Sequence, residues 1–262
     1  MSKYSLKQIV DSVEQKKTWE KQYPINHYIV RPLSFLVTYL IIRVTDSASS
    51  IAWIGFVIGL SGCLSFLGLS WWTAWPGILL IFTFSLLDAV DGNIARTTGN
   101  VTYFGKFLDS VLGQTIEATY CFWIGLGLAL RESADFQLAS TDIVTGRVPV
   151  LPIFCGALIM AGRLLSSLID LQYRYLSAER QENRDRPQRG IGDQIQTSTF
   201  KDYLSYQIFI NFNLLNNQIL FLILCTWAGK IELFLYLLAP YYLARAMIHL
   251  IFFYYRAKER LS

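Results

Sequence analysis

Three aspartates lie close together in an otherwise apolar part of the sequence, within DAVDGNIARTTGNVTYFGKFLD at residues 88–109. Asp88 and Asp91 are three residues apart, so they share one face of a helix, and Asp109 follows after a short turn. Carboxylates without partners are costly to place in hydrocarbon, and three together also repel one another. A hard divalent cation with oxygen ligands removes most of that cost, so the spacing predicts a site for Mg²⁺ or Mn²⁺.

Small and basic residues accompany the aspartates. Gly92 and Ala95 leave the helix backbone bare beside them, and Gly105 stands one turn before the third aspartate. Such small residues allow either close helix packing or the approach of a bulky ligand. Arg96 supplies a cation that suits a phosphate group. An alternative is an ion-pair cluster in which Arg96 and Lys106 neutralise the aspartates, and the spacing alone leaves both interpretations open.

The elements that must position these residues are apolar runs. The 262-residue chain is 53% hydrophobic and 16% charged, and its runs approach the roughly 20 residues that cross a bilayer as a helix. We expect an all-α integral membrane protein with one domain over residues 1–262 and six transmembrane helices in a bundle over 49–256. The six runs fall at about residues 50–70, 74–97, 105–130, 149–172, 207–228 and 231–255. The net charge of +4, carried by scattered cations, argues against nucleic acid as a partner.

A further apolar stretch, HYIVRPLSFLVTYLIIRV at residues 27–44, precedes these runs. It is apolar enough to be a seventh span, but Arg31 and Pro32 interrupt its start. A seventh crossing would also put the Lys-rich N-terminus on the far side of the membrane. We therefore expect an amphipathic helix in the cytoplasmic interface, within an N-terminal segment of residues 1–48.

The distribution of Lys and Arg predicts the orientation. These cations concentrate in the N-terminal segment, in the loop at residues 173–205 and at the C-terminus, whereas the opposite loops are uncharged, mixed or short. The positive-inside rule then places both termini and the 98–104 loop in the cytoplasm. The three aspartates of this multi-pass protein consequently face the cytoplasmic side of the cell membrane.

Two arginines lie in later apolar runs, Arg163 in the fourth and Arg245 in the sixth. One interpretation is pairing between helices, for example of Arg163 with Glu117 in the third run. The other interpretation is an anion site that binds an acceptor substrate beside the metal. The sequence leaves these two interpretations open.

The segment at 88–109 resembles the signature of the CDP-alcohol phosphotransferases, D-x-x-D-G-x-x-A-R-x8-G-x-x-x-D-x-x-x-D. Seven of its positions match, at Asp88, Asp91, Gly92, Ala95, Arg96, Gly105 and Asp109. Members of this family have six transmembrane helices, commonly form homodimers and use divalent metal. They transfer a substituted phosphoryl group from a CDP-linked donor to an alcohol and release CMP. The resemblance therefore implies a membrane transferase of phospholipid or related biosynthesis.

The resemblance also implies roles for the matched residues. Asp88, Asp91 and Asp109 would ligate Mg²⁺ or Mn²⁺, and Asp109 and Arg96 would contribute to catalysis. The nucleotide and diphosphate of the CDP-linked donor would contact five residues, Asp88, Gly92, Ala95, Arg96 and Gly105. Membrane lipids and a second copy of the chain are the other partners that the family implies.

The sequence departs from the family pattern at Gly113, where the family has a fourth aspartate that is its proposed general base and helps to hold a second metal. Three explanations stay open. In the first, Glu117, one turn further along the same helix face, replaces the base. In the second, the acceptor is already ionised, as a phosphate or phosphonate monoester or a carboxylate, and needs no base. In the third, the protein only binds its ligands. A transporter is disfavoured because the acids cluster at one depth.

A second departure lies at the entry to the first span. The family often has Pro-Asn and then Thr there, near the nucleotide. The corresponding positions of this chain are Ala48, Ser49 and Ala52. This difference leaves the identity of the nucleotide base open.

Overall fold

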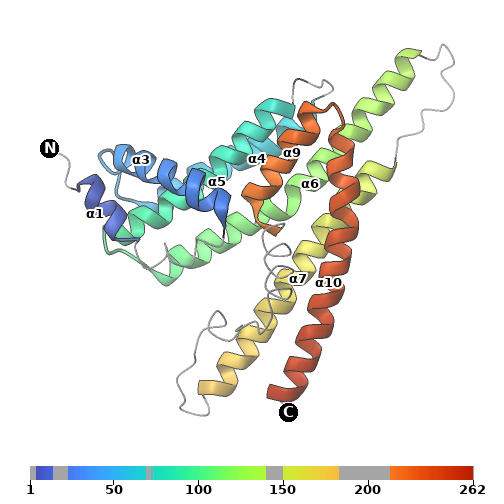
Figure 1. Ribbon diagram of the computed structural model, residues 1–262. Coiled ribbons are helices and arrows are strands. Elements are labelled where there is room, and N and C mark those ends of the chain that lie inside the picture. The colour runs from blue at the N-terminus through green and yellow to red at the C-terminus, as the bar shows by residue number, and fades with distance from the viewer. Residues whose placement is uncertain are drawn as a thin grey trace.

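The computed structural model describes residues 4–13, 23–68, 72, 74–139, 150–182 and 213–261, and the regular structure of this part is helical, without a strand. Figure 1 shows its elements: α1 (Leu6–Asp11), the π-helix η1 (Asn26–Val30), α3 (Arg31–Ile41), α4 (Ala48–Ser65), α5 (Ala74–Thr97), α6 (Tyr103–Ala139), α7 (Val150–Glu182), α9 (Leu215–Trp227) and α10 (Ile231–Leu261). The all-α class expected from the sequence is confirmed.

Four helices are long and apolar enough to cross a bilayer: α4, α5, Val150–Tyr173 of α7 and Ile231–Tyr255 of α10. They coincide with the first, second, fourth and sixth apolar runs. Helix α6 has 37 residues but carries charged side chains along its first half, and α9 has 13 residues. The fifth run, expected from residue 207, begins outside the described residues. The count of six spans therefore stays a prediction.

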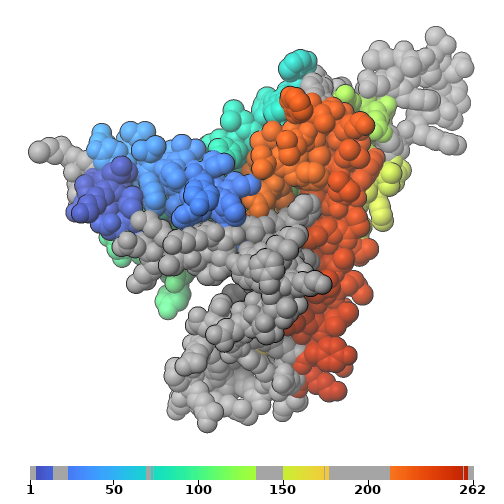
Figure 2. All heavy atoms as spheres, in the orientation of Figure 1, coloured from blue at the N-terminus to red at the C-terminus, as the bar shows by residue number. Residues whose placement is uncertain are grey.

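The long helices pack around one apolar core. Buried side chains from α4, α5, α6, α7, α9 and α10 form it, with Tyr120, Phe234 and Tyr242 among the largest. Helices α7 and α10 run side by side and extend together away from the others (Figure 1). Helices α1 and α3 pack on α5, and η1 lies beside α9 (Figure 2), where Asn216 Nδ2 donates to Asn26 Oδ1 over 2.7 Å.

Glycines on α4 bring it close to the two helices that carry the aspartates. An added Cβ at Gly59 would lie 3.0 Å from the Phe84 ring of α5 and 3.1 Å from the Ile116 side chain of α6. An added Cβ at Gly55 would lie 3.3 Å from Leu87 Cβ of α5. Because both neighbours contact α4 at positions without side chains, α4 holds α5 and α6 at a defined separation.

A short turn joins α5 to α6. Helix α5 ends at Thr97, and Gly99 follows with φ of 71°, a left-handed conformation that glycine adopts without steric cost. Thr102 precedes α6, and its Oγ1 accepts a hydrogen bond from the backbone N–H of Gly105 over 3.0 Å. The turn and the shared contact with α4 bring the aspartates of α5 near Asp109.

The stretch expected to lie in the interface forms one helical segment, in which η1 runs into α3. The 5 residues of η1 and the 11 of α3 make 16, fewer than the roughly 20 needed to cross a bilayer, and α3 packs against α5. Its outer face is apolar: Leu36 is 53% and Leu40 is 61% exposed, whereas Ser34 and Thr38 are fully buried. The placement of this helix at a membrane surface stays a prediction.

Candidate metal and nucleotide site

The three aspartates converge. Asp88 and Asp91 come from α5 and Asp109 from α6, and one carboxylate oxygen of each lies within 4.8 Å of the others. Asp91 is buried, while Asp88 and Asp109 are exposed. An octahedral cation bound at about 2.1 Å separates adjacent ligand oxygens by about 3.0 Å and opposite ones by about 4.2 Å, so side-chain movements of about 1–2 Å bring all three oxygens into range. The donor set therefore fits a divalent cation.

A pocket of about 380 Å³ opens beside the aspartates. Its walls come from the turn before α4, the C-terminal end of α5, the 98–102 turn and the start of α6. Six residues of the signature line it: Asp91, Gly92, Ala95, Arg96, Gly105 and Asp109. The three positions that depart from the family at the first span line it as well: Ala48, Ser49 and Ala52. Six of the seven residues that match the signature thus share one cavity, whose size suits a small-molecule ligand.

Two cations stand in the wall of this pocket. An added Cβ at Gly92 would lie 3.3 Å from Arg96 Nη1, so the guanidinium lies over the bare backbone of residue 92. Lys106 lines the same pocket, and its Nζ lies 5.4 Å from the centroid of the Tyr103 ring. Arg96 and Lys106 thus give the pocket a positive side, which suits an anionic ligand. Pairing of these cations with the aspartates stays the alternative prediction.

A smaller cavity of about 10 Å³ lies at Gly113, enough for about one water molecule. All three aspartates line it, including Asp88, which lines this cavity rather than the larger pocket. An added Cβ at Gly113 would lie 3.6 Å from Asp88 Oδ1, an ordinary van der Waals contact. Position 113 therefore faces the aspartates, as the family pattern implies, and a side chain would fit there.

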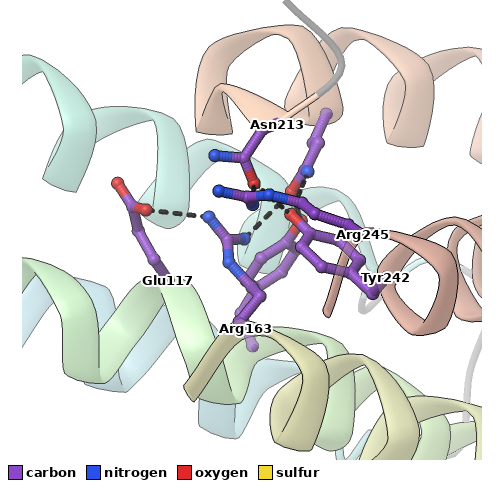
Figure 3. Close-up of polar contacts among 7 residues, drawn as sticks. Glu117, Arg163, Asn213, Tyr242 and Arg245 are labelled. Carbon is purple, nitrogen blue, oxygen red and sulfur yellow. Dashed lines mark hydrogen bonds and ion pairs between the residues drawn. The ribbon is translucent and has the colours of Figure 1, made fainter. Parts of the chain in front are cut away.

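Glu117 forms an ion pair with Arg163 of α7, as Figure 3 shows. Arg163 Nη2 donates to Glu117 Oε2 over 2.8 Å, and its Nη1 donates to Gln218 Oε1 of α9 over 3.1 Å. The Arg163 side chain is 7% exposed and that of Glu117 is 40% exposed. Of the two interpretations that the sequence left open, the pairing of Arg163 with Glu117 is present in the structure, and an anion site stays a prediction.

Arg245 of α10 reaches the same polar network. Its guanidinium donates to Asn213 Oδ1, which also accepts a hydrogen bond from the Tyr242 hydroxyl. The centroid of the Tyr242 ring lies 5.3 Å from Arg163 Cζ and 5.9 Å from Arg245 Cζ. Figure 3 shows both arginines directed toward this group of residues. Among the described residues, these two guanidiniums form one ion pair, that of Arg163 with Glu117.

Apart from Glu117, the hydrogen-bond partners of these arginines were not predicted from the sequence. Gln218 accepts a hydrogen bond from the Tyr120 hydroxyl and donates to the Tyr242 hydroxyl over 2.6 Å. Both tyrosines are completely buried, and in the sequence they look like ordinary aromatic members of apolar runs. The amides at the start of α9 are the signal that indicates a buried polar network there.

Four helices of membrane-spanning length define a multi-pass membrane protein, and the larger pocket with its aspartates, called the acidic pocket, lies next to α4, α5 and α6. A family model described as CDP-alcohol phosphatidyltransferase matches residues 34–181, which is more than half of the 262 residues. The chain belongs to this family, as the resemblance of its signature implied. The matched range contains every residue that lines the acidic pocket.

Two curated proteins resemble part of the chain. The archaetidylinositol phosphate synthase of Pyrococcus horikoshii is 44% identical over 52 residues, which are 20% of this chain and 28% of that protein. The archaetidylinositol phosphate synthase of Aeropyrum pernix is 51% identical over 43 residues, which are 16% of this chain and 22% of that protein. The chain thus matches less than a third of the length of either relative.

Proposed function

We propose that the chain is a metal-dependent membrane transferase. It transfers a substituted phosphoryl group from a CDP-linked donor to an acceptor and releases CMP, in phospholipid or related biosynthesis. The observation that carries this proposal is the convergence of Asp88, Asp91 and Asp109 beside a pocket that also presents Arg96 and the bare backbone of Gly92. Membership in the CDP-alcohol phosphatidyltransferase family supports the class of donor.

Each part of the site has its own role in this proposal. The three aspartates hold a divalent cation, Mg²⁺ or Mn²⁺, which supplies charge neutralisation at the donor's diphosphate. Arg96 donates hydrogen bonds to the same diphosphate, because a guanidinium matches the geometry of phosphate oxygens. Gly92, Ala95 and Gly105 present small surfaces in the pocket wall, along which the nucleotide lies close to the backbone.

The reaction is an in-line displacement at the phosphorus distal to the cytidine. An acceptor oxygen attacks that phosphorus, the bond from the phosphorus to the bridging oxygen breaks, and CMP leaves with the electron pair. Phosphoryl transfer of this kind depends mainly on positioning and on stabilisation of negative charge. Arg96 contributes to both, since it binds the diphosphate and carries a positive charge that does not titrate near neutral pH.

The acceptor brings its oxygen to the space near Gly113. The three aspartates there hold the cation in this proposal, and position 113 itself carries no carboxylate to take a proton from a neutral alcohol. We favour an acceptor that is already ionised, because such a nucleophile needs no base. Arg163 and Arg245 form its anion site, since the two guanidiniums carry one more charge than Glu117 neutralises. The alternative is Glu117 as a relocated base, reached through its free oxygen or a bridging water.

The names of the two relatives support an anionic acceptor. Both are called archaetidylinositol phosphate synthases, and the product in that name contains an inositol phosphate. A phosphate group bound by arginines forms strong, charge-assisted hydrogen bonds. We therefore propose compounds with a phosphate, phosphonate or carboxylate group as the class of acceptor for this chain.

The membrane arrangement is part of the same proposal. Helices α6 and α9 are also spans, which completes a bundle of six, and α3 lies in the interface with its exposed leucines among the lipids. Both termini and the pocket face the cytoplasm at the cell membrane, because Lys and Arg concentrate on that side. The chain forms a homodimer, as the family implies.

The test uses purified full-length protein, Mg²⁺ and a panel of CDP-linked donors, with UDP-linked donors for comparison. Neutral alcohols and phosphorylated compounds serve as acceptors, and release of the nucleoside monophosphate is measured. We expect CMP release that requires both donor and acceptor, stops with EDTA and disappears in Asp91→Asn. If no combination of donor and acceptor releases a nucleoside monophosphate, the proposal of transfer is overturned.

The second candidate function is binding of nucleotide and metal without catalysis. Gly113 favours it, because the position that faces the aspartates lacks the carboxylate of the family pattern. Metal-dependent binding of a CDP-linked compound, without CMP release in the unchanged protein or in Gly113→Asp, would support this candidate over the transferase.

A further inference from the structure

A buried amide stands behind the aspartates. Asn93 lies two residues after Asp91 on α5, and because successive helical residues are about 100° apart, its side chain leaves the helix on the opposite face. It is completely buried. Its Oδ1 accepts a hydrogen bond from Arg31 Nη1 over 3.1 Å. Its Nδ2 donates to Ser34 Oγ over 3.1 Å and to Thr38 Oγ1 over 3.2 Å. We call these four residues, Arg31, Ser34, Thr38 and Asn93, the Asn93 cluster.

The Asn93 cluster has one consistent arrangement of its hydrogens. Ser34 Oγ donates to the Arg31 carbonyl over 2.8 Å, and Thr38 Oγ1 donates to the Ser34 carbonyl over 2.7 Å. Both hydroxyl hydrogens are therefore used within α3, and both hydroxyl oxygens face the amide as acceptors. Because the Arg31 guanidinium can only donate, a flipped amide would place donor against donor. The chemistry of the partners thus determines the orientation of Asn93.

The contacts around the Asn93 cluster are apolar. Val90 and Ile94, on either side of Asn93 in the sequence, are completely buried and pack with Val37 and Ile41 of α3. Apolar contacts are non-directional, so they tolerate a small rotation of one helix against the other. The hydrogen bonds of a buried amide are directional and costly to break. We infer that they set the rotation of α5 about its own axis, together with the buried hydrogen bond that Ser85 Oγ of α5 donates to Asn216 Oδ1 of α9 over 2.7 Å.

That rotation decides whether the carboxylates can share a cation. A carboxylate lies about 5 Å from the axis of its helix, so a rotation of about 10° moves it by about 1 Å. Metal–ligand distances vary by only about 0.2 Å. A rotation of that size exceeds this tolerance, so Asp88 and Asp91 would have to leave favourable rotamers to bind a cation that Asp109 also binds, which weakens the site.

We propose that Asn93 is a positioning residue for the metal centre. Held by α3, it sets the rotation of α5 at which Asp88 and Asp91 meet Asp109. The N-terminal helices thereby support the site from behind, while the residues of the Asn93 cluster lie outside the set that lines the pocket. The effect on metal binding rests on the proposed function of the three aspartates, whereas the effect on the rotation of α5 does not.

The first test measures Mn²⁺ binding to purified full-length variants by electron paramagnetic resonance of the free ion. Asn93→Leu keeps a similar side-chain volume and removes the hydrogen bonds of the amide. We expect its Kd for Mn²⁺ to be at least tenfold higher than that of the unchanged protein. Leu222→Ala creates a cavity at a completely buried position of α9 and is the control for general destabilisation. We expect it to lower the melting temperature but to change the Kd less than threefold.

Thr38→Val extends this test because it removes one acceptor of the Asn93 amide and keeps the shape of the side chain. We expect a smaller rise in the Kd for Mn²⁺ than in Asn93→Leu. Combined with Asn93→Leu, it should add nothing further, because the hydrogen bond that it breaks is already absent. Additive effects of the two substitutions would contradict action through their shared hydrogen bond.

A second measurement follows the rotation of α5 without a metal. Cysteines at positions 88 and 113 report on this rotation, because the side chain of residue 88 reaches position 113: an added Cβ at Gly113 lies 3.6 Å from Asp88 Oδ1. In a background without the native cysteines, we expect Asn93→Leu to slow oxidative crosslinking of this pair at least fivefold. Leu222→Ala should leave the crosslinking rate unchanged.

Unchanged crosslinking in Asn93→Leu, or an equal loss in Leu222→Ala, would overturn the positioning role. Unchanged Mn²⁺ affinity in Asn93→Leu would overturn its consequence for the metal. If the unchanged protein binds no Mn²⁺, the metal site of the proposed function fails, and the crosslinking rates still decide the role of Asn93.

Discussion

Glu117 Oε2 on α6 accepts a hydrogen bond from Arg163 Nη2 on α7 over 2.8 Å. Glu117 is the carboxylate one turn beyond position 113, where the family pattern has its proposed base. If the Glu117 side chain moved toward the aspartates, Arg163 would lose its counter-charge, and its side chain is only 7% exposed to solvent. The ion pair therefore favours a structural role for Glu117 and an acceptor that needs no base.

We expect Glu117→Gln to lower turnover less than about tenfold, because the amide oxygen can still accept the hydrogen bond from Arg163. A lost general base would lower turnover by about 10²–10⁴. The measurement is kcat with the acceptor that the panel identifies, and Glu232→Gln in the first turn of α10 is the matched control. A loss of a hundredfold or more in Glu117→Gln alone would make Glu117 the base.

Gly113→Asp tests the ionised acceptor from the opposite direction. The structure has room for the side chain, since an added Cβ lies 3.6 Å from Asp88 Oδ1. We expect the variant to fold but to lose at least about tenfold in kcat/KM, because the new carboxylate repels an anionic acceptor, and tenfold corresponds to about 1.4 kcal/mol. Gly113→Ala is the control, and it should keep activity and gain about 0.5–1 kcal/mol in helix stability. Faster turnover in Gly113→Asp would favour a neutral alcohol.

Arg245→Gln tests the anion site. The guanidiniums of Arg245 and Arg163 both lie near the Tyr242 ring, and Arg245 donates a hydrogen bond to Asn213. Loss of Arg245 therefore removes one of the two cations at this ring. We expect the KM for a phosphorylated acceptor to rise at least about tenfold while the KM for the donor changes less than about threefold. Arg43→Gln, whose guanidinium lies over the Tyr39 ring, is the control for loss of a stacked arginine. An unchanged acceptor KM in Arg245→Gln would place the acceptor elsewhere.

Asp91→Asn tests the metal site directly. We expect it to abolish divalent-dependent nucleotide binding, because a neutral amide at this buried position is a poor ligand for a hard cation. The melting temperature should be unchanged or higher, since one of three mutually repelling charges is gone. Nucleotide binding is measured by isothermal titration with and without EDTA, and Asp11→Asn on α1 is the control. Binding that survives both Asp91→Asn and EDTA would favour the ion-pair alternative.

The meeting of the aspartates could be predicted because it depends on local geometry. The spacing of Asp88 and Asp91 puts them on one helix face, and the five-residue turn at 98–102 limits how far Asp109 can lie from them. The apolar runs also predicted most of the helices, with α5 at the expected residues 74–97. Local spacing and hydropathy were sufficient for both features.

The polar contacts between distant helices could not be predicted in the same way. Asn93 is 59 residues from Ser34, and Tyr120 is 98 residues from Gln218, so no periodicity connects them. Ser34 and Thr38 are two small polar residues in an apolar stretch. Hydroxyls in such helices often donate a hydrogen bond to a backbone carbonyl of the preceding turn, and both do so here. Their second role, as acceptors for Asn93, depends on how α3 packs on α5.

The closeness of α4 to its two neighbours bears on protein engineering. An added Cβ at Gly59 would lie 3.0 Å from Phe84 and 3.1 Å from Ile116, so a library of variants must keep glycine at this position. The turn before α4 has no such restriction, because Asp46 and Ser47 are exposed and line the larger pocket. On the proposed function, directed evolution toward a donor with another nucleobase would therefore randomise this turn and leave α4 unchanged.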